Sequence, residues 1–241
     1  MIDLVSAYGC SMTIVDSTTN PRESGILFRK GRSGPEQDLV DWFLELHAVK
    51  PKKGERLTVF REPRLPSGFP DLVVVVWNES VAAEWAAERR SILPSDLRLM
   101  QHLATAGPVR ILDLKSLFGS ETERSLSRLE RADMVVLQKG QWRARALSRT
   151  FAIRRIVAIE AKVAEWRAAL DQAFINTWFT PESYVLVPAI PRGGSLLETA
   201  LQHGIGVLSK EKPRLVERRE RRPRSYASWL FNEWTWRLAT L

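Results

Sequence analysis

Hydrophobic and polar positions along this chain follow two periods, which indicates a protein built from both strands and helices. Short apolar runs rich in β-branched residues predict buried strands at 57–60, 71–77, 156–162, 183–187 and 205–209. Apolar residues spaced three and four apart predict helices at 35–49, 79–91, 164–178 and 195–203. Strands that alternate with helices in this way predict an α/β fold, with a mixed sheet flanked by helices.

The segment after Pro94 has a different pattern, in which three short amphipathic helices precede a hairpin. The helices are predicted at 95–106, 111–118 and 121–132, and the hairpin strands at 134–137 and 141–146. We expect Leu97, Met100 and Leu103 of the first helix to face inward, and Ser120 to cap the third helix in a capping box with Glu123. Three helices followed by a hairpin is the element order of a winged helix-turn-helix.

These patterns divide the chain into four parts. They are a first part of the core at 1–78, an inserted winged helix-turn-helix at 79–150, a second part of the core at 151–210, and a basic connector with an aromatic C-terminal helix at 211–241. Within the first part, mixed polar, Gly and Ser content predicts that residues 1–33 are partly irregular, with a short strand at 25–28.

Composition narrows the class of protein. The formal net charge of +8 favours a polyanionic partner such as DNA. A single cysteine, Cys10, excludes an internal disulfide, and with three scattered histidines (His47, His102 and His203) it argues against a zinc site. The longest clean apolar run, 72–77, is too short to span a bilayer, and no signal peptide is recognisable. We therefore expect a cytoplasmic protein with no membrane partner.

Candidate chemistry lies at the ends of two predicted strands. Asp71 opens one strand, while Glu160 and Lys162 close another, where the alternation of a strand points both side chains to one face. If the strands are neighbours, Asp71, Glu160 and the Ala161 carbonyl offer hard oxygen ligands for Mg²⁺ or Mn²⁺. Such a cation polarises a phosphodiester and activates water. Lys162 can hold that water, or help to deprotonate it, and offset charge on phosphorus.

With Pro70-Asp71 and Glu160-Ala161-Lys162, the chain resembles the PD-(D/E)xK nuclease superfamily, which has the restriction-endonuclease-like fold. The resemblance implies metal-dependent cleavage of nucleic acid, an additional metal-site acid at Glu36 and a site-supporting glutamine at Gln172. Two features depart from the family pattern. Asp71 and Glu160 are 160 − 71 = 89 positions apart instead of being joined by a short connection, which fits an inserted module. Asn176 stands where the family often has a tyrosine.

The function expected from the sequence is therefore that of a metal-dependent DNA endonuclease whose inserted module grips the duplex. Polar and basic residues of the third helix and the hairpin would contact DNA: Arg124, Ser127, Arg128, Arg131, Lys139, Arg143 and Arg145. A homodimer, with the aromatic C-terminus as its interface, would supply two active sites. Defence against foreign DNA is an analogy with common users of the fold.

Two other functions remain open from the sequence alone. One is a non-catalytic DNA-binding regulator built on a nuclease-derived scaffold, although the intact set of Asp71, Glu160 and Lys162 argues against it. The other is an interaction protein that holds partners through its winged helix and its Trp-rich C-terminal segment, which would have no affinity for nucleic acid. The sequence does not distinguish DNA from RNA as the substrate.

Overall fold

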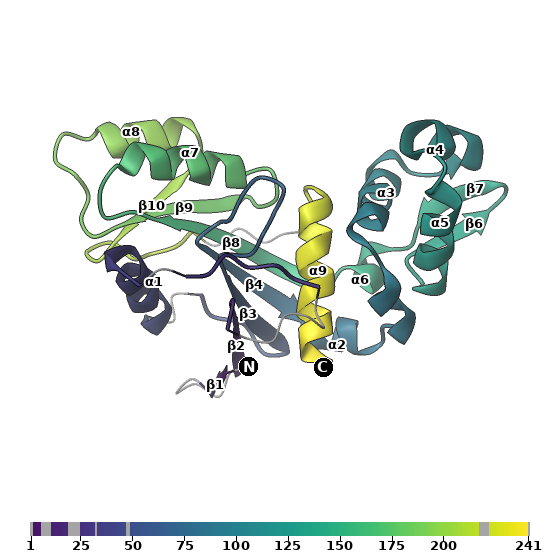
Figure 1. Cartoon of the computed structure of the whole chain (residues 1–241), viewed down its shortest axis with the longest axis horizontal. Helices are drawn as coiled ribbons and strands as arrows, with labels where there is room; N and C mark the ends of the chain where they lie inside the picture. The colour runs from purple at the N-terminus through teal and green to yellow at the C-terminus, as the bar shows by residue number, and fades with distance from the viewer. Residues whose placement is uncertain are drawn as a thin grey trace. The chain divides into compact units, whose positions relative to one another are not determined.

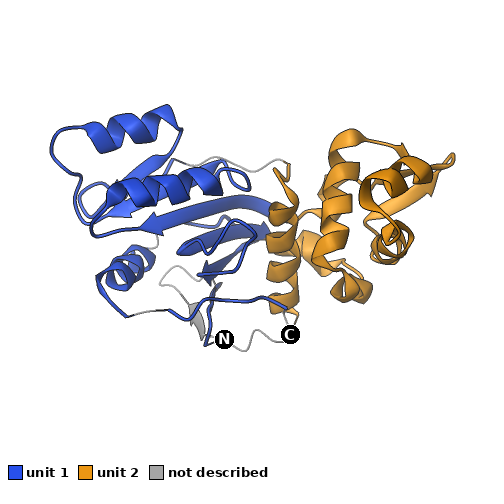
Figure 2. Ribbon diagram, turned by 45° about the horizontal axis from the view of Figure 1, so that its top comes forward, with its two compact units in different colours: residues 1–77, 153–220 blue, residues 78–152, 221–241 orange. Residues whose placement is uncertain are grey.

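The structure is a computed structural model that describes residues 2–5, 11–18, 25–31, 33–46, 49–216 and 222–240. The predictions for Cys10, for His47 and for residues 217–221 of the basic connector lie outside the described residues. The chain forms two compact units, coloured separately in Figure 2. Unit 1 comprises residues 1–77 and 153–220, and unit 2 comprises residues 78–152 and 221–241.

Unit 1 is built on a mixed sheet that, in the described residues, has the strand order β1-β2-β3-β4-β8-β9-β10. Its strands are β1 (Ile2–Val5), β2 (Ser11–Val15), β3 (Glu55–Arg61), β4 (Leu72–Asn78), β8 (Ile153–Ala161), β9 (Glu182–Val187) and β10 (Gly206–Ser209). Strand β8 is antiparallel to β4 on one side and parallel to β9 on the other. The mixed α/β sheet predicted from the sequence is therefore confirmed.

Helices cover both faces of this sheet (Figure 1). Helix α1 (Pro35–Glu45) lies on one face, and α7 (Trp166–Asn176) and α8 (Ser195–Gln202) lie side by side on the other. The alternation of β9 explains the arrangement. Tyr184 and Leu186 join the core cluster of α1, whereas Val185 and Val187 join that of α7 and α8.

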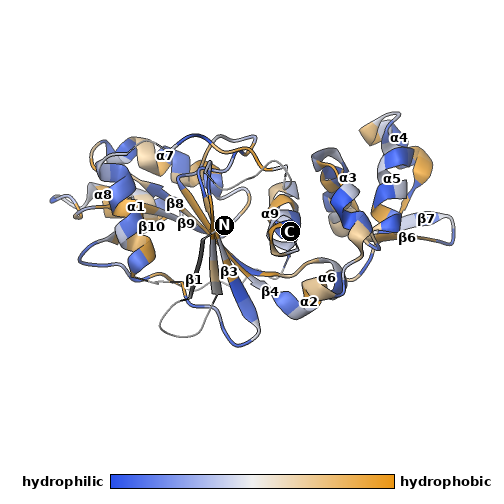
Figure 3. Ribbon diagram, turned by 60° about the horizontal axis from the view of Figure 1, so that its bottom comes forward, coloured by the Kyte–Doolittle hydropathy of each residue, from blue (hydrophilic) through white to orange (hydrophobic). Residues whose placement is uncertain are grey.

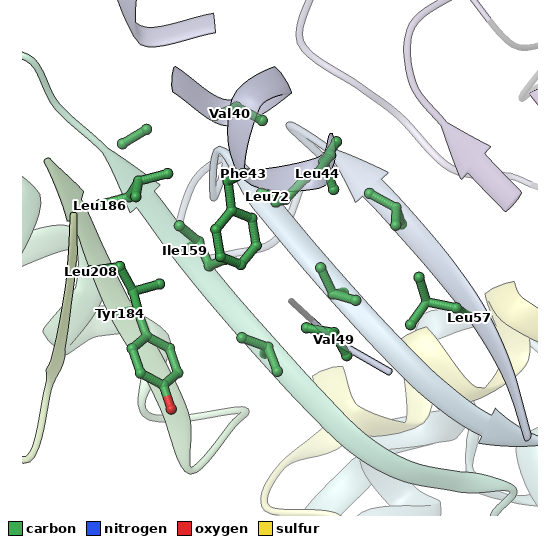
Figure 4. Close-up of a cluster of buried hydrophobic side chains, with 14 of the residues drawn as sticks. Val40, Phe43, Leu44, Val49, Leu57, Leu72, Ile159, Tyr184, Leu186 and Leu208 are labelled. Carbon is green, nitrogen blue, oxygen red and sulfur yellow. The ribbon is translucent and has the colours of Figure 1, made fainter. Parts of the chain in front are cut away.

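The core beneath α1 fixes the two strands that lead to the candidate site. Phe43 of α1 points between Leu72 of β4 and Ile159 of β8, and all three side chains are buried (Figure 4). Leu72 and Ile159 are also directly paired in the sheet. Burying a large apolar side chain contributes about 1.5–3 kcal/mol. A one-residue slip between β4 and β8 would turn this apolar set to the other face, so the core specifies the register.

The N-terminal segment corrects one prediction. The described residues at 16–18 and 25–33 are irregular, as expected, but the strand predicted at 25–28 is absent: the strands are β1 and β2, and Phe28 forms only an isolated bridge with Pro63. Strand β2 pairs in parallel with β3, Met12 opposite Leu57. A five-residue run has too little periodicity to be recognised alone, and pairing with β3 supplies the missing stabilisation. The first predicted helix is also shorter, because α1 ends at Glu45.

Unit 2 contains helices and a small antiparallel sheet of order β5-β7-β6 in the described residues. Its elements are α2 (Glu79–Ala83), the 3₁₀ helix η1 (Ala87–Ser91), α3 (Pro94–Ala106), β5 (Val109–Arg110), α4 (Ile111–Phe118), α5 (Thr122–Arg131), β6 (Val135–Gln138), β7 (Gln141–Ala144), α6 (Leu147–Thr150) and α9 (Tyr226–Ala239). Figure 3 shows hydrophobic and hydrophilic residues mixed along α3 and α5, as expected for amphipathic helices.

Two local predictions in unit 2 are wrong. The helix expected at 79–91 is divided into α2 and η1, and Trp85 between them donates its indole N–H to the Arg149 carbonyl. This tertiary contact outweighs the helix propensity of the segment. In α4 only Leu114 is buried. Leu112 and Leu117 are exposed.

The predicted capping box is also absent. Glu121, and not Ser120, occupies the N-cap position of α5, without a side-chain cap hydrogen bond. Glu123 forms an ion pair with Lys115 of α4 instead. An exposed carboxylate has little to gain from a helix N-terminus when a cation lies within reach.

The aromatic C-terminal helix α9 belongs to unit 2, although the sequence pattern set it apart from the inserted module. Trp229, Phe231, Trp234 and Trp236 are all buried. Trp229 packs edge-on against Phe151 and donates to Gln101, both of unit 2. These aromatic side chains are therefore not exposed as the dimer interface that the sequence suggested. In the described part of the chain, no helix combines the length and the apolar character needed to cross a membrane.

Candidate active site

The candidate site forms where β4 begins and β8 ends. Because the strands are antiparallel and Leu72 pairs with Ile159, Asp71 comes to lie beside the end of β8. The Ala161 backbone N–H donates to Asp71 Oδ2 at 2.9 Å. The loop before Asp71 is tied to the end of α7, since the Trp178 indole donates to Ser67 Oγ at 3.0 Å. Asp71 and the strand end that carries Glu160 and Lys162 therefore converge, as the sequence pattern required.

Glu160 is a carboxyl group buried inside the protein, with only 1% of its surface exposed. Burial raises its pKa well above the ordinary value, and the neighbouring charge of Asp71 raises it further. Two groups oppose this shift and lower the pKa: Asn176 Nδ2 of α7, which donates to Glu160 Oε1 at 2.6 Å, and the Asp71 backbone. The other oxygen, Glu160 Oε2, is buried and has no hydrogen-bond partner in the described structure.

Asp71 shares this electrostatic setting. Burial raises its pKa, whereas the Ala161 N–H and the charge of Lys162 lower it, and the net shift is upward. Arg29 approaches from the other side, with a guanidinium nitrogen 3.6 Å from Asp71 Oδ1. The Arg29 guanidinium is held in place by an ion pair with Glu62. A buried carboxyl group beside a half-buried one, both with raised pKa values, forms an arrangement that a bound cation would stabilise.

Lys162 forms an ion pair with Glu36 of α1, in which Nζ lies 2.9 and 3.0 Å from the two carboxylate oxygens. Burial lowers the pKa of Lys162, but this hydrogen bond and the charges of Glu36, Asp71 and Glu160 raise it above its usual value. Lys162 is therefore an ammonium group at neutral pH. It is suited to donate hydrogen bonds and to offset negative charge, and poorly suited to act as a base.

A pocket of about 270 Å³ opens beside these groups. It is lined by Arg29, Glu36, Gln37, Val40, Glu62, Asp71, Ala161, Lys162 and Gln172. Of the residues that the sequence singled out for catalysis or metal binding, all except Glu160 line this pocket. Glu160 lies buried between Asp71 and Asn176, as its hydrogen bond and pKa shift require.

Sequence reasoning missed three residues of the site. Asn176 had a signal, because it follows Gln172 by four positions and so lies on the same face of α7. It was noted only as a departure from the family pattern. Arg29 and Glu62 had no signal, since neither stands in a motif, and the fold alone brings them to Asp71.

The donor set at the site fits a hard divalent cation. Asp71, Glu160 and the Ala161 carbonyl would hold it, and the unpartnered, buried Glu160 Oε2 is the atom that most needs a cation. The Glu36 carboxylate pairs with Lys162 and does not join Asp71 and Glu160 in this donor set. Consistent with this, the described residues contain no group of three His, Cys, Asp or Glu side chains arranged to hold a metal. The remaining coordination positions would therefore fall to a backbone oxygen, water or substrate.

The predicted DNA-contacting residues of unit 2 differ in their availability. Arg128 forms a two-pronged ion pair with buried Asp96, both distances being 2.7 Å, and Arg145 pairs with Asp133. Arg124 pairs with Glu121 and Arg143 donates to Gln138, but both arginines are exposed. The exposed surface also includes Ser127, Arg131 and Lys139. Arg128 is thus the member of the predicted set with the clearest structural role.

Comparisons with protein-family models, with characterised proteins and with solved structures gave no match. Functional assignment therefore rests on the chemistry of the site.

Proposed function

We propose that this protein is a metal-dependent nuclease that hydrolyses phosphodiester bonds in DNA. The observation that carries the proposal is the pairing of Asp71 with buried Glu160, whose Oε2 lacks a partner, next to the protonated Lys162. Two carboxyl groups that resist ionisation and a neighbouring ammonium group suit a site for a cation and an anionic ester. The proposal extends to a restriction-endonuclease-like core for unit 1.

In this proposal each group has one task. Mg²⁺ or Mn²⁺, when bound by Asp71, Glu160 and the Ala161 carbonyl, supplies the Lewis acidity that makes the phosphorus electrophilic. Lys162 donates a hydrogen bond to a phosphate oxygen, and its charge offsets the negative charge that develops on the phosphoryl oxygens, while the attacking water passes its proton to the surrounding water. Glu36 fixes the Lys162 ammonium at the rim of the pocket. Gln172, which lines the same pocket, supports the substrate.

Unit 2 is proposed to bind the nucleic acid as a winged helix. The order of α3, α4, α5 and the β6–β7 hairpin supports this, with α5 as the recognition helix and the hairpin as the wing. Exposed Arg124, Arg131 and Lys139, together with the net charge of +8, would supply phosphate contacts. Cleavage of both strands would need two active sites, hence two copies of the chain, joined by a surface other than the buried aromatic face of α9.

The test is cleavage of supercoiled plasmid and of single-stranded DNA in Mg²⁺ or Mn²⁺. Asp71→Asn and Lys162→Ala would be compared with the wild type, and Asp38→Asn, an exposed carboxylate change on α1, is the matched control. Metal-dependent cleavage that the first two changes abolish and the third leaves intact would support the proposal. Cleavage by all four proteins would place the activity elsewhere. Binding of duplex without any cleavage would favour the regulator.

A further inference from the structure

The Asn176 side chain donates a hydrogen bond to the Glu160 carboxyl group. It lies at the end of α7 with 3% of its surface exposed, and its Nδ2 is 2.6 Å from Glu160 Oε1. Its backbone carbonyl independently accepts from the Phe179 and Thr180 N–H groups. The backbone at this position is therefore fixed by the helix end, and the side chain is free to act on Glu160.

The hydrogen bond from Asn176 gives the two Glu160 oxygens different environments. Oε1 is occupied by the amide, while Oε2 is buried and makes no hydrogen bond to any of the described residues. A carboxylate held at one oxygen keeps its plane and aims the other oxygen in a constant direction. An amide serves this purpose well, because it is neutral over the whole pH range and does not compete with a cation for Glu160. A basic side chain at position 176 would compete with the cation for Glu160, and a carboxylate there would compete with Glu160 for the cation.

We propose that Asn176 is a positioning residue, which orients Glu160 so that Oε2 is directed to the divalent cation. The inference rests on the proposed function, because it requires that Asp71 and Glu160 hold a metal. It also accounts for the departure noted in the sequence, since the side chain that replaces the family's usual tyrosine contacts a metal-binding carboxylate directly. Outer hydrogen bonds of this kind typically contribute a factor of about 10–100 to metal affinity.

The experiment measures Mn²⁺ binding by the full chain without DNA, by calorimetry and by the loss of the free-ion paramagnetic resonance signal. Asn176→Ala removes the side chain, and Asn176→Leu keeps a similar volume while removing the donor. The matched control is Ser183→Ala, which removes another buried hydrogen bond to α7, from Ser183 Oγ to the Ala173 carbonyl at 2.6 Å, without touching Glu160. Thermal unfolding of the metal-free proteins is recorded in parallel.

Both Asn176 variants are expected to bind Mn²⁺ about 10–100-fold more weakly than the wild type, while Ser183→Ala binds within about twofold of it. A purely structural role for Asn176 would instead lower the unfolding temperature of the metal-free protein and leave the Mn²⁺ affinity unchanged, and that result would overturn the inference alone. Absence of Mn²⁺ binding by the wild type would overturn the proposed metal site as well.

Discussion

At the scale of single residues, Asp71 lies beside buried Glu160, and its charge raises the cost of ionising Glu160, while burial raises that cost for both carboxyl groups. Protonation relieves this repulsion, as would a divalent cation. The folded protein without metal therefore binds protons more tightly at these positions than the unfolded chain does. Stability without metal should consequently depend on pH in a direction set by these two groups.

The sign of this dependence can be tested with Glu160→Gln. Because the pKa of Glu160 is raised on folding, the wild type loses stability as pH rises from the unfolded pKa through the folded one. A glutamine side chain does not ionise, so the variant does not lose stability in this way. Its amide oxygen can still accept a hydrogen bond from Asn176. We expect the variant to gain unfolding temperature over the wild type at about pH 8, with the gain shrinking towards about pH 4. A gain of equal size at both pH values would contradict the prediction.

The ion pair between Glu36 and Lys162 leads to an experiment that distinguishes two roles for Glu36, as an anchor for Lys162 or as a metal ligand. If Glu36 holds Lys162, Glu36→Gln should reduce cleavage by about tenfold while the Mn²⁺ affinity stays within about twofold of the wild type. The physical reason is that the Lys162 ammonium loses its charged anchor but the cation keeps its ligands. Calorimetry and plasmid cleavage of the same preparation measure both effects. A tenfold loss of Mn²⁺ affinity would show that Glu36 is itself a ligand.

The convergence of the candidate site residues could be predicted because strand alternation and strand ends depend on local sequence. Glu160 lies near the end of β8 with Lys162 directly after that strand, and Asp71 directly precedes β4, so only the pairing of β4 with β8 had to be assumed. Arg29 and Glu62 could not be found, because their approach to Asp71 follows from the packing of a loop. Asn176 was visible on the right helix face, but its hydrogen bond to Glu160 depends on how α7 packs on the sheet.

At the scale of elements, long periodic segments were predictable and short or tertiary ones were not. Helices α3 and α7 and strands β4 and β8 carry enough apolar positions to define a face or a buried run. Strand β2 has five residues and depends on its pairing with β3. The break between α2 and η1 depends on contacts of Trp85 and Arg89 with residues distant in the sequence, which no local pattern reports.

The ion pair between Arg128 of α5 and Asp96 of α3 gives a prediction about the helices of unit 2. Asp96 is fully buried, so Arg128→Ala would leave a carboxylate without its cation. We expect the free energy of unfolding of unit 2 to fall by about 3 kcal/mol. Arg131→Ala, at an exposed position on the same helix, should change it by no more than about 0.5 kcal/mol.

Urea denaturation followed by tryptophan fluorescence measures both variants of α5. DNA affinity, measured for the same variants, then distinguishes an arginine that contacts DNA from an arginine that stabilises unit 2. Loss of binding by a stable Arg131→Ala protein would report a DNA contact, while equal stability of Arg128→Ala and the wild type would refute the structural role of Arg128.

At the scale of the whole molecule, unit 2 is assembled from two segments that are distant in the sequence. Arg89 of η1 and Glu233 of α9 join them through a buried ion pair, at 2.6 and 3.0 Å, and the Arg89 guanidinium stacks on Trp85. Both side chains are 1% exposed. Because both groups are buried, each charge needs the other to compensate for its lost hydration.

Removing one partner of this ion pair should therefore lower the free energy of unfolding more than removing both partners. We expect Arg89→Met to lower the free energy of unfolding of unit 2 by about 3–5 kcal/mol, and the double change Arg89→Met with Glu233→Leu to recover much of the loss. Hydrogen exchange of backbone amides in α3 and α9 measures the effect. Additive losses in the double variant would show that the two charges are not coupled.

The two segments of unit 2 also impose an order on biosynthesis. Residues 153–220, which belong to unit 1, are translated between them, and this takes roughly 3–14 s at 5–20 residues per second. During that interval α3 has emerged without α9, the helix whose Trp229 bonds to Gln101 of α3. The apolar surface of α3 that α9 later covers remains open on the ribosome-bound chain. A nascent chain paused before residue 221 therefore presents a binding surface for chaperones, and translation speed through residues 153–220 sets how long that surface persists.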